Sequence, residues 1–413
     1  MNWLLTNVRI ADRTETVDIA IANGRIAQIR STSSVQVGPA IVGAATQRWD
    51  LTGRVVLPGL VEPHVHLDKT YLNSSGSFPN RSGTLLEAID VWLVAKKQRS
   101  GADVQVAVRR ALRSAIAHGV TAMRSHVDTE EPSDLETLAA ILEVREEFRH
   151  AIELQIVALG FAGTSPVIDR TMADALALGA DLVGGAPALT PDPAASLAAS
   201  FALAERFGKP IDLHIDETED PASHTLLTLA EMTIAAGMQG QVTAGHCCSL
   251  AFLAAAAAGR VIERVAAAGL HIVTLPSCNL VLMGRGMQPP PRGVTRVAEL
   301  LAAGVNVCAG SDNVQDPFNP FGSYDPLQSA HFAAHTAHMT GADELVTCRE
   351  MVTNRAAAAL GLDGYGLREG APADLVVLDA FDPQEAVTAP PPRLATFKGG
   401  RLVVRTQTER EWI

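Results

Sequence analysis

The chain has 413 residues, more than one ordinary hydrophobic core accommodates, so we expect two domains or one large barrel with an appendage. Hydrophobic residues make up 47% of the chain and charged residues 19%, a globular composition that excludes a disordered chain. The formal net charge of −12 disfavours nucleic acid or an anionic membrane as a partner.

The sequence shows neither a targeting or membrane-spanning segment nor a disulfide framework, and both points bear on the cellular compartment. The amino-terminal stretch lacks the basic region and sustained apolar run of a signal peptide, and the longest apolar run, 250–258, is too short to cross a bilayer. The five cysteines are odd in number and show no disulfide-framework spacing. We therefore expect a reduced, cytoplasmic protein.

The two ends of the chain are rich in β-strand patterns. Residues 17–30 alternate in polarity around Asn23-Gly24, which is a hairpin signal. Residues 373–380 and 394–405 repeat this pattern, and the second of them turns at Gly399-Gly400. Because chain termini often lie close together, we expect both ends to form one small β-domain.

The middle of the chain alternates helical patterns with short apolar runs of strand length. The eight runs are 55–66, 119–127, 152–159, 180–185, 210–216, 241–246, 270–275 and 305–312, of which 180–185 is the weakest. Eight strands that alternate with helices over about 300 residues indicate an α/β fold, a (β/α)8 TIM barrel.

Active sites of such barrels lie at the carboxyl ends of the strands, and polar residues gather there. Five of the twelve histidines fall at the ends of predicted strands: His64, His66, His126, His214 and His246. Acidic and amide side chains occur in the same segments: Asp128, Gln155, Asp216, Glu217, Asn279, Asp312 and Asn313.

These strand ends can supply a metal site. Residues at i and i+2 of a strand face the same side, so His64 and His66 can both point into the barrel mouth. His214 adds a third imidazole and Asp312 adds a hard oxygen. Such a ligand set suits Zn²⁺ or Fe²⁺ with an open position for water, whose pKa the ion lowers.

Each of these residues also has a purely structural interpretation. An isolated H-x-H pair can be incidental, His126 can be a buried core histidine, and Asp312 can cap a helix. Only the agreement of separate strand ends favours the metal site.

Several segments resemble the amidohydrolase superfamily, and within it the bacterial cytosine deaminase branch. They are PGLVEPHVHLDKT (58–70), DLHIDETED (212–220), VTAGH (242–246) and GSDNVQDPF (310–318), and the resemblance covers nearly the whole chain. It implies a barrel of residues 57–364 and a small β-sandwich domain built from residues 1–56 and 365–413. The family commonly assembles, which implies a homo-oligomer.

Carried over by position, the resemblance implies that His64, His66, His214 and Asp312 hold the metal. Glu217 matches the proton shuttle of the family, and His246 matches the histidine that orients the attacking water. Gln155 matches a glutamine that reads the edge of the pyrimidine. Relatives with two metals carry a bridging lysine near the fourth strand; residues 180–185 contain none, so we expect one Zn or Fe ion.

The activity that the resemblance implies is hydrolytic deamination of cytosine or a close relative, such as isocytosine or a 5-substituted cytosine. Asp312, assisted by His246, would deprotonate the attacking water, and Glu217 would protonate a ring nitrogen. The purely structural alternative for Glu217 is a surface charge in the acidic run 216–220.

The sequence departs from the family at two places. Ser311-Asp312-Asn313 stands where cytosine deaminases carry His-Asp-Asp, so Asn313, which can also donate a hydrogen bond, is expected to contact the ring. Cys247-Cys248 stands where threonines are usual, and we interpret Asp68-Lys69 as loop structure around the pocket.

Two alternatives to an aminopyrimidine deaminase stay open. The Ser-Asp-Asn pattern resembles that of relatives acting on substituted triazines, so the enzyme could instead remove an amine from a triazine or another cyclic amidine-like ring. A degenerate barrel that only binds a ligand predicts missing metal ligands, whereas all four are present.

Overall fold

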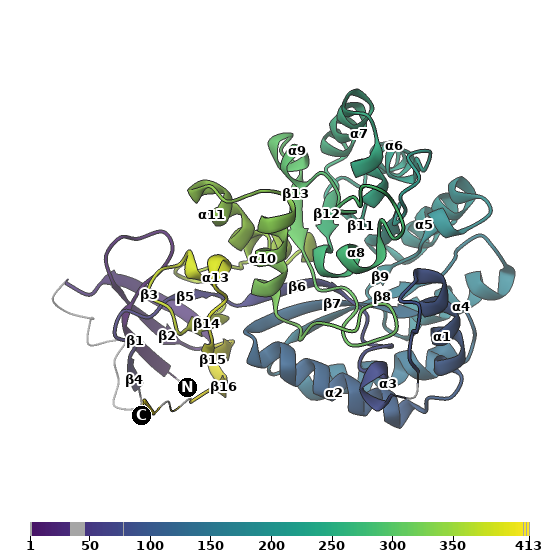
Figure 1. Cartoon of the computed structure of the whole chain (residues 1–413). Helices are drawn as coiled ribbons and strands as arrows, with labels where there is room; N and C mark the ends of the chain where they lie inside the picture. Colours follow the sequence, from purple (N-terminus) through teal and green to yellow (C-terminus); the bar gives the residue numbers. More distant parts are fainter. Residues whose placement is uncertain (1, 34–45, 77, 408, 410, 413) are drawn as a thin grey trace.

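The structure is a computed structural model that describes residues 2–33, 46–76, 78–407, 409 and 411–412 (Figure 1). Its centre is a parallel sheet of eight strands that follow one another in chain order. The strands are β6 (Leu60–Val65), β7 (Val120–Asp128), β8 (Glu153–Leu159), β9 (Leu182–Val183), β10 (Ile211–Ile215), β11 (Val242–His246), β12 (His271–Thr274) and β13 (Asn306–Ala309).

The sheet curves into a nearly closed barrel. Just beyond β13, Asp312 forms a parallel bridge with Val65 of β6, and its amide donates a hydrogen bond to the carbonyl of His64 at 2.9 Å. Each of the eight predicted runs contains one barrel strand, so the predicted fold class is confirmed. The weakest run, 180–185, contributes the two-residue strand β9.

Helices surround the barrel (Figure 1). Helix α2 illustrates how the sequence forms them: Ser100 and Asp103 make a reciprocal capping box at its start, and its buried face includes Val104, Val108 and Leu112. The helices are α1 (Leu85–Lys96), α2 (Gly101–Ala117), α3 (Asp134–Phe148), α4 (Pro166–Leu178), α5 (Pro193–Phe207), α6 (Thr225–Ala236), α7 (Ala255–Ala267), α8 (Pro276–Leu282), α9 (Val297–Ala302), α10 (Pro326–Thr336), α11 (Ala342–Glu350), α12 (Asn354–Leu360) and α13 (Glu385–Thr388), with short 3₁₀ turns at Leu72–Ser75, Pro187–Leu189 and Cys248–Phe252.

The two chain ends form a pair of four-stranded sheets beside the barrel (Figure 1). The sheets share one hydrophobic core, in which the rings of Trp3 and Phe397 meet edge to face with centroids 5.3 Å apart. One sheet has the order β3 (Arg25–Ser31), β2 (Val17–Ala22), β1 (Asn2–Val8), β4 (Thr46–Asp50), and the other has the order β16 (Arg401–Arg405), β15 (Arg393–Lys398), β14 (Leu375–Leu378), β5 (Val56–Pro58).

Both predicted hairpins are present. Asn23 and Gly24, with φ of 53° and 77°, join β2 to β3, and Gly399 and Gly400, with φ of 53° and 70°, join β15 to β16. Positive φ at both turn residues is what a two-residue hairpin with the native strand twist requires.

The structure corrects the predicted first barrel run, 55–66. This run divides at Gly59: β5 pairs with β14 in the sheet of the chain ends, and only β6 enters the barrel. A Cβ atom at Gly59 would lie 2.3 Å from the side chain of Thr121, so glycine is required where the chain changes sheets.

The division at residues 57 and 364 stays a prediction. Strand β5 lies across its first boundary, and residues 34–45 of the first segment lie outside the described residues. Among the described residues, no helix combines the length and the apolar character that crossing a membrane requires.

Candidate active site

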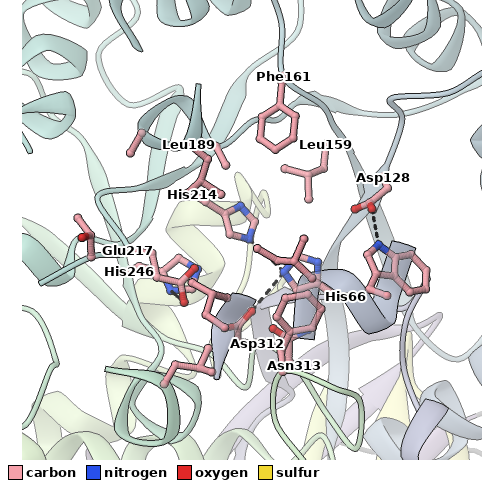
Figure 2. Close-up of a pocket in the computed structure, with 18 of the residues that line it drawn as sticks. His66, Asp128, Leu159, Phe161, Leu189, His214, Glu217, His246, Asp312 and Asn313 are labelled. Atoms are coloured by element: carbon pink, nitrogen blue, oxygen red, sulfur yellow. Dashed lines mark hydrogen bonds and ion pairs between the residues drawn. The ribbon is translucent and has the colours of Figure 1, made fainter. Parts of the chain in front are cut away.

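The carboxyl ends of the strands surround a pocket of about 490 Å³ (Figure 2). Its floor carries polar side chains that the sequence singled out, and its walls are largely apolar. The floor includes His66, His214, Glu217, His246, Asp312 and Asn313, and the walls include Leu85, Ile89, Trp92, Leu159, Phe161 and Leu189. A pocket of this volume is of the size that holds small-molecule ligands.

The four predicted metal ligands converge on the pocket floor. The Nε2 atom of His66 lies 3.0 Å from Nε2 of His214 and 3.2 Å from Oδ1 of Asp312. The Nε2 atom of His64 lies 3.6 Å from the same carboxylate oxygen. Ligand atoms held about 2.1 Å from one tetrahedral ion lie about 3.4 Å from each other, so these contacts suit a single ion. The ligand atoms of His64, His214, Asp312 and also His246 lie within 4.8 Å of one another.

The hydrogen bonding of these residues points to the same conclusion. Both ring nitrogens of His64 and both carboxylate oxygens of Asp312 are buried without a hydrogen-bond partner among the described residues. Unpaired buried polar atoms are costly, and metal coordination would satisfy them. Burial lowers the pKa of His64 and of His214 well below the ordinary value, which keeps both rings in the neutral form that binds metals.

The local sequence makes room for this arrangement. Gly245 precedes His246 in β11, and a Cβ atom at this glycine would lie 3.0 Å from Cε1 of His64. His246 and Asp312 both adopt the left-handed region, with φ of 66° and 60°. Non-glycine residues rarely do so, and such strained positions cluster at functional sites.

Beside the metal ligands, Glu217 and His246 form a second polar pair. Oε1 of Glu217 lies 3.2 Å from Nδ1 of His246, and the amide of Asn279 lies 3.4 Å from this oxygen and 3.1 Å from this nitrogen. Figure 2 shows both side chains at one side of the pocket, next to Asp312. Asn279, which the sequence analysis left without a role, therefore holds the pair together.

Burial shifts the pKa values of Glu217 and His246 in opposite directions. Burial, reinforced by Asp312 and Glu219, raises the pKa of Glu217 well above its ordinary value. Burial lowers the pKa of His246 to about 4, although Asp312 opposes this shift. The two shifts favour the neutral carboxylic acid of Glu217 and the neutral imidazole of His246, the forms in which one partner can donate a proton and the other can accept one.

The buried carboxylates of Glu62 and Asp216 fix the loops that carry the site through hydrogen bonds. The carboxylate of Glu62 accepts hydrogen bonds from the amide and the hydroxyl of Ser311, at 2.9 and 2.5 Å, directly before Asp312. The carboxylate of Asp216 accepts from Ser223 and from the amide of Leu226, which ties the loop containing Glu217 to the start of α6.

Asn313 lies in the pocket, as predicted. Its side-chain amide donates to Oδ2 of Asp316 at 2.7 Å, and its carbonyl oxygen lies 3.9 Å from the sulfur of Cys278. The contact of Asn313 with a bound ring stays a prediction.

The structure places Gln155 elsewhere. Its carbonyl oxygen accepts from two nitrogens of Arg124, at 3.0 and 2.9 Å, and its amide donates to the carbonyl of Leu360 at 2.8 Å. Leu159, four positions further along β8, lines the pocket, which puts Gln155 about 13 Å away along the strand. The predicted ring contact of Gln155 does not fit this geometry; Leu159 and Phe161 occupy that wall instead.

His126 lies behind the metal ligands rather than among them. Its ring centroid is 4.0 Å from that of His64, and its Nε2 atom is 3.5 Å from Oδ1 of Asp212. Asp212 in turn accepts a hydrogen bond from Arg124 at 2.8 Å. His126 therefore packs against the back of His64 and limits how that ring can turn.

Lys69 is the pocket residue that the sequence analysis missed, because it was interpreted as loop structure. Its side chain lines the pocket, and its Nζ atom donates to Oδ1 of Asp128 at 2.9 Å. The available signal was two charges placed directly after a pair of metal ligands, in a segment otherwise apolar enough to be buried.

Comparison with known proteins identifies the family. The Amidohydrolase family matches residues 82–404. The chain belongs to this family. It is a hydrolase that acts on C–N bonds, and the predicted resemblance is confirmed at the level of the superfamily.

Individual relatives within the family act on different rings. The structure of 5-methylcytosine deaminase from Klebsiella pneumoniae, liganded with 5-fluorocytosine, is 34% identical with a TM-score of 0.92, and the match covers 100% of this chain and 99% of that one. Pterin deaminase of Rhizobium rhizogenes is 35% identical over 94% of this chain and 88% of its own. N-isopropylammelide isopropyl amidohydrolase of Pseudomonas sp. is 28% identical over 98% and 97% of the two chains.

Proposed function

We propose that this protein is a metal-dependent hydrolytic deaminase of cytosine or a closely related aminopyrimidine, such as isocytosine or a 5-substituted cytosine, and that it releases ammonia. The observation that carries this proposal is the pair formed by Glu217 and His246 beside the converging metal ligands. The similarity to a 5-methylcytosine deaminase over the whole chain supports it.

The proposed cofactor is one divalent ion, Zn or Fe, held by His64, His66, His214 and Asp312. When bound, the ion would supply a Lewis acid that lowers the pKa of water at the open position. Strand β9, Leu182–Val183, offers no lysine that could bridge a second ion.

The residues around the ion divide the proton transfers. The carboxylate of Asp312 accepts a proton from the attacking water, and His246 orients that water toward the ring carbon that carries the amine. Glu217 donates its proton to the adjacent ring nitrogen, while a new C–O bond forms. Glu217, now deprotonated, passes the hydroxyl proton of the adduct to the amine, the C–N bond breaks, and ammonia leaves as the ring carbonyl forms; the proton on Asp312 then restores Glu217.

A second candidate substrate is a two-ring compound that contains an aminopyrimidine. The pocket of about 490 Å³ is larger than a single six-membered ring requires, and its outer wall, formed by Leu85, Ile89 and Trp92 of α1 and by Phe161, is apolar. A fused second ring would bury this surface. The 35% identity to a pterin deaminase supports this candidate.

An ammonia-release assay with the zinc- and iron-loaded protein tests the proposal. The panel contains cytosine, 5-methylcytosine, isocytosine, pterin and an aminotriazine. We expect turnover of at least one aminopyrimidine; turnover of the triazine alone would overturn the proposal and favour the triazine alternative. We also propose that the protein is a homo-oligomer and that it is cytoplasmic. Light scattering of the purified protein measures the oligomeric state.

A further inference from the structure

Lys69 is the only lysine or arginine that lines the pocket in the described part of the chain. Apart from the histidines and Glu217, whose neutral acid form is favoured, the other titratable groups that line this cavity are the carboxyl groups of Asp128, Glu130, Asp220 and Asp312. An oxygen atom with negative character on a bound ring would be repelled by these groups. Apart from the proposed metal site, the ammonium group of Lys69 is the charged group that would attract such an oxygen atom.

The ammonium group of Lys69 is held in place from behind. Nζ lies 2.9 Å from Oδ1 of Asp128 and 3.6 Å from Oδ2 of Asp68. Asp128 also accepts a hydrogen bond from the indole of Trp92 at 2.6 Å, and its own amide donates to Asp68 at 3.0 Å. Burial opposes the charge, but Asp128 and Asp68 outweigh burial and raise the pKa of Lys69, so the group stays cationic.

This network leaves donor capacity that faces the cavity. An ammonium carries three N–H groups. One of them donates to Asp128, and Asp68 lies beyond ordinary hydrogen-bond distance. Nζ is also 4.9 Å from the ring centre of Trp92 and 5.7 Å from that of Phe318, two further pocket residues. The aromatic flanks exclude water, which strengthens a charged hydrogen bond to a ligand.

An ion pair with a purely structural role would not need to line the pocket. Lys96 is an example of such an ion pair. Its Nζ atom lies 3.3 Å from Asp134 and 3.7 Å from Glu130, its side chain is 7% exposed against 5% for Lys69, and it does not line the pocket. The chain therefore contains two equally buried lysines in neighbouring acidic clusters, and only one of them reaches the cavity.

We propose that Lys69 determines specificity by donating a hydrogen bond to an exocyclic oxygen of the ring, so that the enzyme selects oxo-aminoheterocycles over the same rings without that oxygen. This inference rests on the proposed deaminase function and adds the feature that the substrate must carry. Oxygen selection of this kind is effective because a buried donor loses its partner when the oxygen is absent.

The test is the variant Lys69→Met assayed on matched substrate pairs. Cytosine and 4-aminopyrimidine share the reacting amine and differ in one exocyclic oxygen; isocytosine and 2-aminopyrimidine form a second such pair. In Lys69→Met we expect kcat/KM for the oxo substrate to fall about 10- to 100-fold, the range of a charged hydrogen bond, while the oxygen-free substrate changes much less. An unchanged ratio, or an equal loss on both members of a pair, would overturn the proposal.

The control variant is Lys96→Met, which removes an equally buried ammonium outside the pocket. It should leave the substrate ratio unchanged, and both variants should bind one equivalent of zinc. A shift of the ratio in Lys96→Met as large as in Lys69→Met would assign the effect to the acidic network and overturn the role of Lys69.

A binding measurement separates this proposal from the deaminase function itself. Uracil and pyrimidin-4-one are the products of the first substrate pair and differ only in the oxygen. Zinc-loaded wild type should bind uracil more tightly, and Lys69→Met should lose about tenfold or more of that preference. If the wild type releases no ammonia from any ring but this preference is present, the deaminase proposal fails and the oxygen recognition stands. If the preference is absent, the role of Lys69 fails.

Discussion

The Nε2 atoms of His66 and His214 lie 3.0 Å apart, although 148 positions separate the two residues in the chain. Both side chains approach from opposite parts of the barrel wall, and each has an Nδ1 atom that is buried without a hydrogen-bond partner among the described residues. A metal cation held between the two imidazole rings and the Asp312 carboxylate would stabilise this convergence.

Removal of the metal should therefore lower stability as well as activity. A ligand that binds only the folded state adds about 2.7 kcal/mol at a concentration one hundred times its Kd. We expect chelation to lower the Tm, added zinc to restore it, and His214→Ala to abolish the zinc response. Calorimetry with and without zinc measures this; the surface variant His150→Ala should respond as the wild type does. An equal Tm of the metal-free and zinc-loaded wild type would contradict the metal assignment.

Glu217→Gln should retain zinc and lose most turnover. The amide keeps the size of the side chain but cannot donate and accept the proton, and loss of a positioned acid costs about 10²- to 10⁴-fold in kcat. Elemental analysis and ammonia release measure both parts. The matched control is Glu146→Gln, whose exposed carboxylate pairs with Arg149 at 2.8 Å on α3, away from the pocket. Rates near those of the wild type in Glu217→Gln would refute the acid role.

Asn313→Asp should shift relative rates toward cytosine if Asn313 reads the ring. This substitution should also lower the stability of the fold. The new carboxylate would lie next to Oδ2 of Asp316, and the 2.7 Å hydrogen bond that the Asn313 amide donates to this oxygen would be lost. Burial already raises the pKa of Asp316 to about 6. We expect the single variant to be less stable at pH 8 by about 1–3 kcal/mol, and the double variant Asn313→Asp/Asp316→Asn to recover much of this loss. Unchanged relative rates in a stable double variant would count against ring contact.

Gln155→Leu should change stability and leave substrate preference intact. The variant removes the acceptor of two Arg124 nitrogens inside the barrel, and an unpaired buried group costs about 1–3 kcal/mol. Urea unfolding measures the loss, and the substrate panel measures the preference. A selective change in the rates for one ring would restore the predicted contact.

Asp128 should contribute stability that disappears in acid. Burial opposes its ionisation, but Lys69 and Lys96 outweigh burial and lower the pKa of Asp128 to about 2, against about 3.9 in an unfolded chain. Because the folded pKa is the lower one, the contribution of about 2 kcal/mol is complete above pH 4 and is lost as the pH falls toward 2. Unfolding of the wild type and Asp128→Asn across this range should show their difference shrinking; a difference independent of pH would exclude this linkage.

The sequence was sufficient to predict the barrel, and it placed the proposed metal ligands at one edge of the sheet, for physical reasons. Strands recur as apolar runs, parallel strands end at one edge, and His64, His66, His214 and Asp312 stand at those ends. The exchange of sheets at Gly59 was not predictable, because β5 and β6 follow each other within one segment of strand character and the reason for the break is the distant Thr121.

The positions of Gln155 and Lys69 could not be predicted from the sequence, for related reasons. Gln155 lies inside β8 rather than at its end, and its partner Arg124 belongs to the neighbouring strand β7, so only the register between the strands reveals the pairing. Lys69 looks like a solvated charge until Asp68 and Asp128 are seen to enclose it, and Asp128 lies 59 positions further along the chain. The surroundings of Gln155 and of Lys69 both depend on contacts with residues that are far away in the sequence.

The bridge between Val65 and Asp312 has a consequence for how the enzyme matures. The barrel closes where its first strand meets the segment after its last, and the proposed metal ligands lie on both sides of this seam. A nascent chain that has released His64 and His66 therefore still lacks the carboxylate that completes the set, and metal capture must await emergence of the segment after β13. An ion held by these proposed ligands would bridge the seam, so metal binding would stabilise the closed barrel as well as support the chemistry.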